Sequence, residues 1–481
     1  MKINHMKKKV HFIGICGKGM SALAIMMKQT GWAISGSDEG FYNPGVIYDL
    51  LKKHKINFNE KYAKGNIPKD TILIVIGKHA KLVPETNDEV KEAFASGIKI
   101  QSMPQALGDL ALKTENTVVA GSFGKSSITS LLTWCLKSAK KDPSYFIAAS
   151  AYDLKENGYI GKGKDFIMEG DEYPSANWDN TSKFLYLHPK NIILTSGEHD
   201  HFNIFKTEES YIKPFEKLVS MLPKDGLLVA SYHGKNVKRI VKKAKCKVVF
   251  YGLKQATKGH LWYAENIKYG KVTTFDLHRG DKKIATLKTK LLGSGNIENI
   301  VGVSAFLLEK KLLSIKEIQK TVYSFKGISG RLDLKTDKSS LLVYESFGSS
   351  YIKAKSDLGA LRMHFPKKKI VTLFEPHTFS WRDPKNLEWY KDVFKESDEI
   401  IVLLPPETHG KNLSDQLSLE VIIKEIKKNQ KNTFGTTDPK EVMQLLKERL
   451  AKEDILVLMS SGDLHGLIKD ILPWVEKKFP K

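Results

Sequence analysis

One stretch of the sequence reads Thr117-Val118-Val119-Ala120-Gly121-Ser122-Phe123-Gly124-Lys125-Ser126-Ser127, and a helical pattern continues over residues 126–138. This order predicts a buried strand, a glycine-rich turn and a helix. Backbone N–H groups in such a turn can face a phosphate, and the helix N-terminus adds partial positive charge. Lys125 is placed to reach β- and γ-phosphates, and the Ser126 hydroxyl to bind Mg²⁺. We therefore predict an ATP site, against the alternative of an ordinary glycine turn with an exposed lysine.

Strand-like apolar runs and helical patterns alternate in both directions from this turn. Such alternation predicts parallel sheets of the α/β class. A first unit closes near Leu112, and a last unit starts near Gly330. Between them, residues 247–290 show partial alternation and hairpin-like turns, which predict an antiparallel insert. Besides 117–120, the predicted strands are residues 10–14, 33–37, 72–76, 166–168, 192–195, 227–230, 341–344, 370–374, 400–404 and 455–459.

The composition sets the class of protein. The 481 residues include three cysteines without any CxxC pair, which argues against a disulfide framework or a structural zinc site and favours the cytoplasm. No apolar run approaches the ~20 residues of a membrane span. The net charge is +23, but the lysines are scattered and arginine is scarce, so we expect a solvated surface rather than a nucleic-acid interface.

A second glycine turn lies near the N-terminus. Gly14-Ile15-Cys16-Gly17-Lys18-Gly19-Met20 follows a predicted strand and opens the helix predicted at residues 20–30. It satisfies the spacing of a pyrophosphate-binding turn without the full GxGxxG form, and Asp38 ends the next strand, where an acid would meet a ribose or a base. A simple tight turn is the alternative. The pattern suggests a second nucleotide-like ligand.

Two acidic segments follow predicted strands of the middle region. Glu169-Gly170-Asp171-Glu172-Tyr173 comes after residues 166–168, where acids could hold Mg²⁺ against phosphates. A solvated acidic loop is the alternative. Glu198-His199-Asp200-His201 follows residues 192–195, and a transition-metal site is a minor alternative there, because no matching His or Cys cluster accompanies it.

Together these elements resemble the Mur ligases of peptidoglycan synthesis, over nearly the whole chain. The segments from Gly14 to Ala24 and from Glu169 to Tyr173 resemble the ligases that act on UDP-muramoyl substrates. Ser182-Lys183-Phe184 resembles the murein-recycling branch, the murein peptide ligases that attach a released tripeptide to UDP-N-acetylmuramate. The L-alanine-adding branch is the next most similar. The resemblance implies three α/β domains: a UDP-binding domain at residues 1–112, an ATP-binding domain at 113–328 and a Rossmann-like domain at 329–481.

The resemblance also implies roles for individual residues. Catalytic roles fall to Lys125, Glu169, Asp200 and His201, and Mg²⁺ would be bound by Ser126 and Glu169. Contacts with the UDP-linked substrate fall to Gly14, Gly17, Gly19, Met20 and Asp38. Contacts with ATP fall to Gly121, Ser122, Gly124, Lys125, Ser126, Ser127, Asn296, Arg331 and Glu345.

Some positions depart from the family pattern. Phe123 occupies a position of the phosphate turn that is usually polar, and Gly295 replaces the histidine before Asn296. The family's Asp-Asp-Tyr-Ala-His-His-Pro stretch is here Glu345-Ser346-Phe347-Gly348-Ser349-Ser350-Tyr351, so both histidines are missing. These departures leave the fold intact but bear on the activity and on the identity of the incoming amine.

The expected function is an ATP- and Mg²⁺-dependent ligation of an amino acid or peptide to UDP-N-acetylmuramate through an acyl-phosphate. One alternative is a non-catalytic protein of the same fold that binds a UDP-sugar or ATP. Another is a ligase with a different acid and amine, which the Gly14 turn and Asp38 disfavour. We expect a cytoplasmic enzyme that is a monomer or a weak homodimer and binds neither nucleic acid nor membranes.

Overall fold

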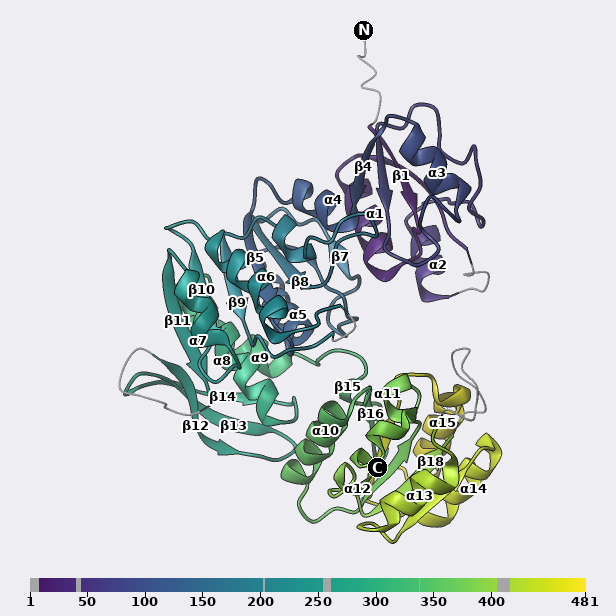
Figure 1. Ribbon diagram of the computed structural model, residues 1–481. Helices are drawn as coiled ribbons and strands as arrows, with labels where there is room; N and C mark the ends of the chain where they lie inside the picture. The colour runs from purple at the N-terminus through teal and green to yellow at the C-terminus, as the bar shows by residue number, and fades with distance from the viewer. Residues whose placement is uncertain (1–7, 40–44, 202–203, 254–260, 337, 405–415) are drawn as a thin grey trace. The chain divides into compact units, whose positions relative to one another are not determined.

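The computed structural model describes residues 8–39, 45–201, 204–253, 261–336, 338–404 and 416–481. The chain divides into two compact units. The first extends to residue 326, without residues 268–273 and 290–294, and the second contains those two segments and residues 327–481. Figure 1 shows the elements of both units. Among the described residues, no helix is long and apolar enough to cross a membrane.

The first unit opens with a four-stranded parallel sheet in the order β2-β1-β3-β4. The sequence of β3, Leu-Ile-Val-Ile, is buried at every position, as expected of a parallel strand covered on both faces. The elements of this part are β1 (Lys9–Ile13), α1 (Lys18–Gln29), β2 (Ala33–Ser37), α2 (Val46–Lys53), β3 (Leu73–Ile76), α3 (Asp88–Ala95), β4 (Lys99–Ser102) and α4 (Met103–Leu110).

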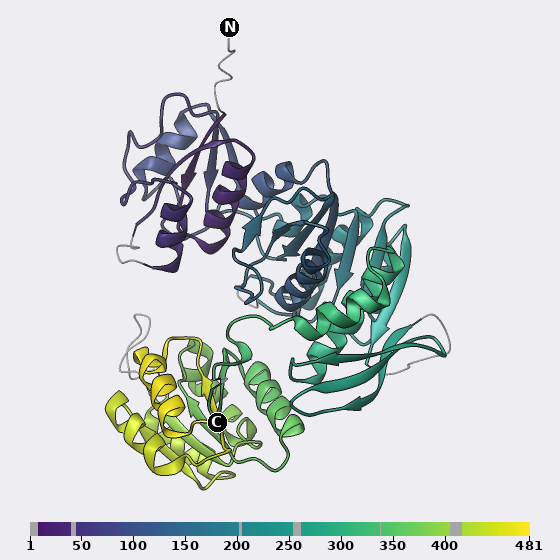
Figure 2. The ribbon, with the colours of Figure 1, turned by 180° about the vertical axis from the view of Figure 1, so that it is seen from behind.

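A ten-stranded sheet follows, in the order β14-β13-β12-β11-β10-β9-β5-β8-β6-β7. Seen from behind in Figure 2, α8 and α9 come forward, and α9 packs against β14 and α5. The elements are β5 (Glu115–Ala120), α5 (Lys125–Ser138), β6 (Ser144–Phe146), β7 (Gly158–Tyr159), β8 (Asp165–Gly170), η1 (Lys183–Tyr186), β9 (Asn191–Leu194), α6 (Glu208–Ser220), β10 (Leu227–Ser231), α7 (Val237–Ile240), η2 (Val241–Lys243), β11 (Lys247–Gly252), β12 (Trp262–Lys268), β13 (Thr273–Arg279), β14 (Lys282–Thr289), α8 (Ser294–Glu309) and α9 (Ile315–Ser324).

Strands β8, β5 and β9 are neighbours in this sheet, and both pairs run parallel. Because the carboxyl ends of parallel strands meet at one edge, the segments that follow these three strands lie side by side. These segments are the glycine turn after β5, the acidic segment after β8 and the Glu198–His201 segment after β9. The sheet therefore brings the main predicted site segments of the middle region together.

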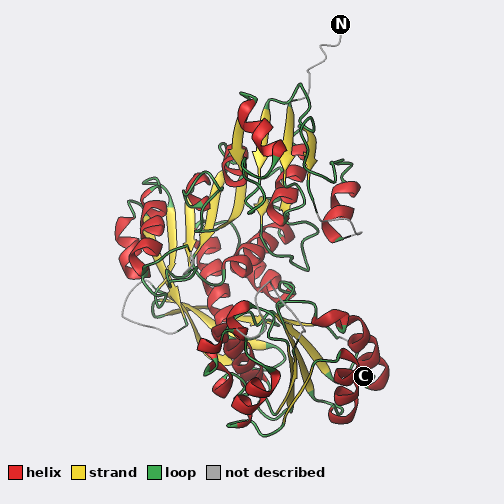
Figure 3. Cartoon of the chain, turned by 45° about the vertical axis from the view of Figure 1, so that its right-hand side comes forward, coloured by secondary structure: helices red, strands yellow, loops and turns green. Residues whose placement is uncertain are grey.

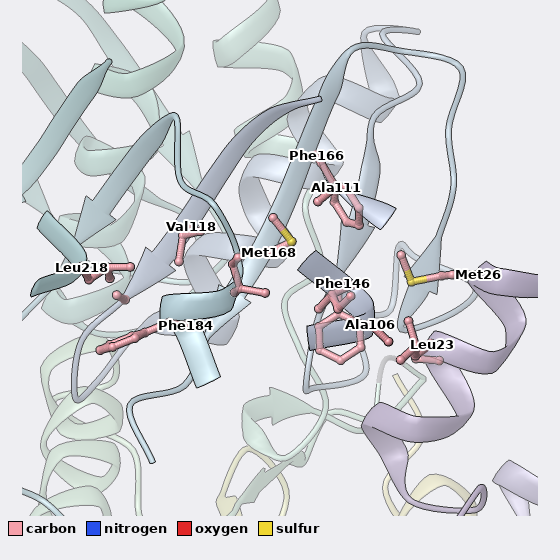
Figure 4. Close-up of a cluster of buried hydrophobic side chains, with 14 of the residues drawn as sticks. Leu23, Met26, Ala106, Ala111, Val118, Phe146, Phe166, Met168, Phe184 and Leu218 are labelled. Atoms are coloured by element: carbon pink, nitrogen blue, oxygen red, sulfur yellow. The ribbon is translucent and has the colours of Figure 1, made fainter. Parts of the chain in front are cut away.

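One hydrophobic core continues from the first sheet into the ten-stranded sheet. It includes Leu23 and Met26 of α1, Phe146 at the end of β6 and Met168 of β8, all at most 5% exposed. Figure 4 shows these side chains together. This shared core explains why the two sheets belong to one compact unit.

The second unit is built on a six-stranded sheet in the order β15-β16-β20-β17-β18-β19. Among the described strands of this sheet, β15 pairs antiparallel with β16, and the other neighbours pair parallel. Separate hydrophobic clusters involve α10 and α13 in one case and α14 and α15 in the other, and Figure 3 shows helices flanking the strands. The elements are β15 (Arg331–Leu334), β16 (Leu342–Ser346), α10 (Tyr351–His364), β17 (Ile370–Phe374), α11 (Phe379–Arg382), η3 (Pro384–Asn386), α12 (Trp389–Asp392), β18 (Glu399–Leu403), α13 (Leu419–Lys427), β19 (Thr433–Thr436), α14 (Pro439–Arg449), β20 (Ile455–Met459), η5 (Leu464–Gly466) and α15 (Ile468–Lys478).

The predicted α/β class is confirmed, with three parallel-rich sheets in the three predicted segments. The predicted antiparallel insert at residues 247–290 is wrong at its start, because β11 pairs parallel with β10 and with β12. Only two residues join β13 to β14, a connection that makes an antiparallel hairpin. The predicted domain boundaries at residues 112 and 328 remain predictions.

Candidate functional site

The turn between β5 and α5 depends on its glycines. Gly121 has φ +136°, and a Cβ there would lie 2.0 Å from Thr195 Oγ1. Gly124, the N-cap of α5, has φ +78°. Side chains are disfavoured at both backbone conformations, so glycine is needed to present the turn's backbone N–H groups at the start of the helix.

Lys125 and Ser126, the first residues of α5, both face acids of the segment after β8. Lys125 Nζ donates to Gly121 O (2.8 Å) and lies 2.9 Å from Glu172 Oε2. Ser126 Oγ donates to Glu169 Oε1 at 2.7 Å. Burial lowers the pKa of Lys125, but the Glu172 carboxylate outweighs it, and the net pKa is raised. The lysine is thus held charged beside the turn.

The carboxyl end of β8 supplies oxygen ligands. Glu169 is buried, and its Oε2 accepts a hydrogen bond from Ala148 N at 2.9 Å. Burial raises the pKa of Glu169, and the nearby Asp171 carboxylate acts in the same direction. A divalent cation would relieve this repulsion. Mg²⁺ prefers carboxylate and hydroxyl oxygens with phosphates and water, so the Glu169 and Ser126 pair fits that ion.

Asp200 and His201 lie at the same sheet edge, where His201 Nε2 is 3.1 Å from Glu172 Oε1. The hydrogen bond with Glu172 raises the pKa of His201. Glu172 itself is buried, which raises its pKa, but His201 and Lys125 outweigh this and lower it to about 2. Asp200 Oδ1 accepts from the His201 backbone N–H at 2.7 Å. Glu172 therefore links the lysine of the turn to the histidine.

One histidine of the transition-metal alternative is already hydrogen-bonded within the chain. His199 Nε2 donates to Phe205 O at 2.8 Å, so this nitrogen already has a partner. Among the described residues, no group of three or more His, Cys, Asp or Glu side chains is arranged to hold a metal ion.

A cavity of about 330 Å³ opens beside the turn. Asn299 and Gly295 of α8 line it, whereas Asn296 is not among its lining residues. Ser196 Oγ is buried at the cavity without a hydrogen-bond partner in the described part of the chain. The cavity has the size of a small ligand pocket, and its other lining residues are Phe123, Gly124, Thr195, Glu198, Ser231, His233, Gly234, Lys235, Tyr251 and Glu298.

Of the N-terminal turn, Gly14 has φ +85°, and Gly17 caps α1. A Cβ on Gly19 would lie 3.2 Å from Met103 Cε and 3.4 Å from Phe146 Cζ, so this glycine allows close packing of α1 against neighbouring elements. The Met20 side chain is buried in the core. It could therefore meet a ligand only through its backbone.

The Asp38 carboxylate, predicted to contact the uridine, accepts hydrogen bonds from within the chain. Its Oδ2 accepts from Cys16 N at 2.7 Å, and its Oδ1 accepts from Glu39 N (2.7 Å) and Tyr62 OH (3.1 Å). Burial raises its pKa, although these hydrogen bonds act in the opposite direction. Asp38 therefore stabilises the N-terminal turn through its hydrogen bond with Cys16, and its contact with a nucleoside remains a prediction.

Arg331 and Glu345 belong to the second unit. Arg331 is exposed at the start of β15, opposite Ser346 in the strand register. Glu345 Oε2 lies 2.6 Å from Lys335 Nζ. The carboxylate thus has a counter-ion within its own unit, and the predicted ATP contacts of both residues remain predictions.

Sequence comparison decides the family. The model of the Mur ligase middle domain matches residues 119–307, and the model of the Mur ligase family catalytic domain matches residues 9–114, together more than half of the chain. The chain belongs to the Mur ligase family. The predicted family resemblance is confirmed, whereas the closer resemblance to murein peptide ligases is not.

This Mur ligase is similar to three named proteins. UDP-N-acetylmuramate–L-alanine ligase of Acetivibrio thermocellus is 28% identical over 95% of this chain and 94% of that protein. The structure of UDP-N-acetylmuramate–alanine ligase of Thermotoga maritima covers 98% of this chain and 100% of that one, with TM-score 0.78 at 19% identity, and supports the fold. The UDP-N-acetylmuramate:L-alanyl-gamma-D-glutamyl-meso-diaminopimelate ligase of Neisseria meningitides is 26% identical, with TM-score 0.60, over 67% of this chain and 99% of that one.

Some residues of this Mur ligase site gained a role only in the structure. Glu172 lies in the predicted acidic segment, but its contacts with Lys125 and His201 depend on three separate strand ends. Ser196 gave no signal in the sequence. Ser122 and Ser127, by contrast, were predicted from the sequence to contact ATP, and that role remains a prediction. Ser127 is half-buried in the first turn of α5, and Ser122 Oγ donates to Glu198 O.

Proposed function

We propose that this Mur ligase joins the α-amino group of an L-alanyl residue to the carboxylate of UDP-N-acetylmuramate at the expense of ATP. The observation that carries the proposal is the turn in which Lys125 and the Ser126–Glu169 pair lie together beside a cavity. Triphosphate binding needs such backbone donors, a cation and oxygen ligands for Mg²⁺. We propose that the enzyme acts in the cytoplasm.

The L-alanyl amine is the chemistry that two relatives share. One is named for ligation of L-alanine, and the other for ligation of a peptide that begins with L-alanine, both to UDP-N-acetylmuramate. We propose the same acid and the same kind of amine for this chain. The free amino acid and the tripeptide are the two donors to compare.

The reaction proceeds in two steps. The substrate carboxylate oxygen attacks the γ-phosphorus of ATP, and the bond from this phosphorus to the bridging oxygen breaks. ADP is the leaving group, and the substrate becomes an acyl-phosphate. The neutral amine then attacks the acyl carbon, and phosphate and a proton leave as the amide forms. Such phosphoryl transfer asks the protein mainly for positioning and charge neutralisation.

Charges of the described residues suit these demands. Lys125 is held protonated by Glu172, and His201 carries a raised pKa beside the same carboxylate. The Lys125 ammonium would stabilise negative charge on the transferred phosphoryl group, and His201 would do so in its protonated form. Ser126 and Glu169 would hold Mg²⁺, which would supply further charge neutralisation when bound.

Replacement of Lys125 tests the proposal. We expect Lys125→Ala to abolish turnover, because the loss of one such charge contact costs several kcal/mol of transition-state stabilisation. Amide formation is followed by mass spectrometry, with UDP-N-acetylmuramate, Mg·ATP and either L-alanine or L-alanyl-γ-D-glutamyl-meso-diaminopimelate. Lys224→Ala, on the turn before β10, is the matched control. A Lys125→Ala enzyme with wild-type turnover would refute the assignment, and a wild-type enzyme that binds both nucleotides without product would support the non-catalytic alternative.

A further inference from the structure

A pair of lysines lies where the first sheet meets the central sheet, and the reaction above assigns it no role. Lys183 comes from η1, and Lys78 follows β3. The Lys183 ammonium lies 3.5 Å from Asp171 Oδ2 and 4.1 Å from the centre of the Tyr173 ring. Its side chain is only 16% exposed. The Lys183 side chain is therefore held beside the acidic segment after β8.

Lys78 reaches the same segment from the first sheet. Its Nζ donates to Pro174 O at 3.2 Å, next to Tyr173. Asn177 fixes this contact from the other side, because its Nδ2 donates to His79 O (2.8 Å) and Leu82 O (3.0 Å). Several hydrogen bonds thus join the segment after β3 to the segment after β8. As a result, Lys78 and Lys183 contact the same short segment, residues 171–174.

The charges of this pair are incompletely balanced. Asp171 is the carboxylate beside Lys183, and among the described residues no carboxylate is paired with Lys78. Lys78 is exposed to solvent, but partial desolvation lowers its pKa, and so does the positive charge of Lys183. Burial also lowers the pKa of Lys183, against the effect of Asp171. An oxyanion beside both ammonium groups would favour their charged forms and accept charge-assisted hydrogen bonds from them.

The pair lies between the two glycine turns. On one side, the segment that carries Lys78 touches the N-terminal turn: Gly77 N donates to Ile13 O, and a Cβ on Gly14 would lie 2.8 Å from Leu82 Cδ1. On the other side, Asp171 is two residues from Glu169, which binds Ser126 of the phosphate turn. A UDP-linked acid that extends from the first turn toward the second would bring its diphosphate or its carboxylate to this segment.

We propose that Lys78 and Lys183 are positioning residues that together bind an oxyanion of the UDP-linked acid. This inference rests on the proposed function, since it takes its ligand from that reaction. The oxyanion is either the diphosphate or the lactyl carboxylate, and both would be contacted by the same ammonium groups. ATP is held by the other turn and does not depend on this pair.

Calorimetry on the full chain tests the inference with Lys78→Met, Lys183→Met and Lys183→Arg. The probes are UDP-N-acetylmuramate, UDP-N-acetylglucosamine, which lacks the carboxylate, and Mg·ADP. We expect each methionine variant to raise the Kd for UDP-N-acetylmuramate about tenfold or more, because a charge-assisted contact is lost. The Kd for Mg·ADP should stay within about twofold of wild type, and Lys183→Arg should keep most of the affinity.

Lys190→Met is the matched control, since Lys190 pairs with Asp225 and lies just before β9, at the opposite end of the strand from the site. Equal losses for both UDP-sugars identify the diphosphate as the oxyanion, and a loss for the muramate alone identifies the carboxylate. If the methionine variants bind UDP-N-acetylmuramate with wild-type affinity, the inference is overturned, but the proposed function is not. If wild type itself binds no UDP-N-acetylmuramate, the proposed function fails as well. Lys78 is exposed, so Lys78→Met keeps the test valid should Lys183→Met not fold.

Discussion

At the scale of single residues, Glu172 determines the charge of two neighbours. It lies 2.9 Å from Lys125 Nζ and 3.1 Å from His201 Nε2 and is almost fully buried. Glu172→Gln keeps the shape but removes the negative charge. We therefore expect the pKa of His201 to fall toward its ordinary value, and the pKa of Lys125 to fall because its burial is no longer outweighed. NMR titration of the His201 ring measures the first effect.

The contact between Glu172 and His201 predicts a pH range in which the folded state is most stable. The pKa of His201 is raised, so its contribution is complete below the ordinary histidine pKa and is lost as pH rises through the folded-state pKa. The pKa of Glu172 is lowered to about 2, so its contribution is present above the ordinary glutamate pKa and is lost as pH falls toward 2. Glu172→Gln should flatten both limbs of the curve of melting temperature against pH. Glu209→Gln, whose carboxylate pairs with Arg239 on the surface, should leave the His201 titration unchanged. An unchanged His201 pKa in Glu172→Gln would contradict this account.

At the scale of elements, the phosphate turn and the start of α8 contain glycines with opposite requirements. Gly121 has φ +136° and no room for a Cβ, whereas a Cβ on Gly295 would meet nothing within 4 Å. We expect Gly121→Ala to cost about 1–3 kcal/mol through backbone strain and to abolish Mg·ADP binding. Gly295→Ala should be neutral or stabilise the helix by up to about 1 kcal/mol. Thermal unfolding and calorimetry compare the two variants, and wild-type nucleotide affinity in Gly121→Ala would show that the turn does not bind phosphate.

The elements also show what sequence patterns can predict. Strands such as β17 were predictable to the residue because an apolar run between polar segments admits few alternatives, and the glycine turn was predictable because its chemistry is local. The parallel pairing of β11 was not, since strand order depends on contacts far apart in the chain. Side-chain direction was harder still. Asp38 turns toward Cys16, and Asn299 rather than Asn296 lines the cavity, for reasons that lie in tertiary packing.

At the scale of the whole molecule, the two units differ in how their cores are built. The first has a core shared between two sheets, and the second has clusters of its own on its six-stranded sheet. Because a multidomain chain need not unfold in one step, we expect two calorimetric transitions. Core truncations assign them: Leu218→Ala should lower only the transition of the first unit, and Leu446→Ala only that of the second. Each side chain is fully buried, so each loss should be about 2–5 kcal/mol.

Once assigned, the transitions locate the nucleotide. A ligand that binds only the folded unit stabilises it by about 2.7 kcal/mol at a hundredfold excess over its Kd. We expect Mg·ADP to raise the transition of the first unit, because the phosphate turn and its cavity are built entirely from that unit. Lys125→Ala should remove this shift. A rise of similar size in the second transition would show that residues such as Arg331 also hold the nucleotide, as the family resemblance implies. No rise in either transition would mean that the turn at Lys125 does not bind ADP, and the proposed ligation would lose its energy source.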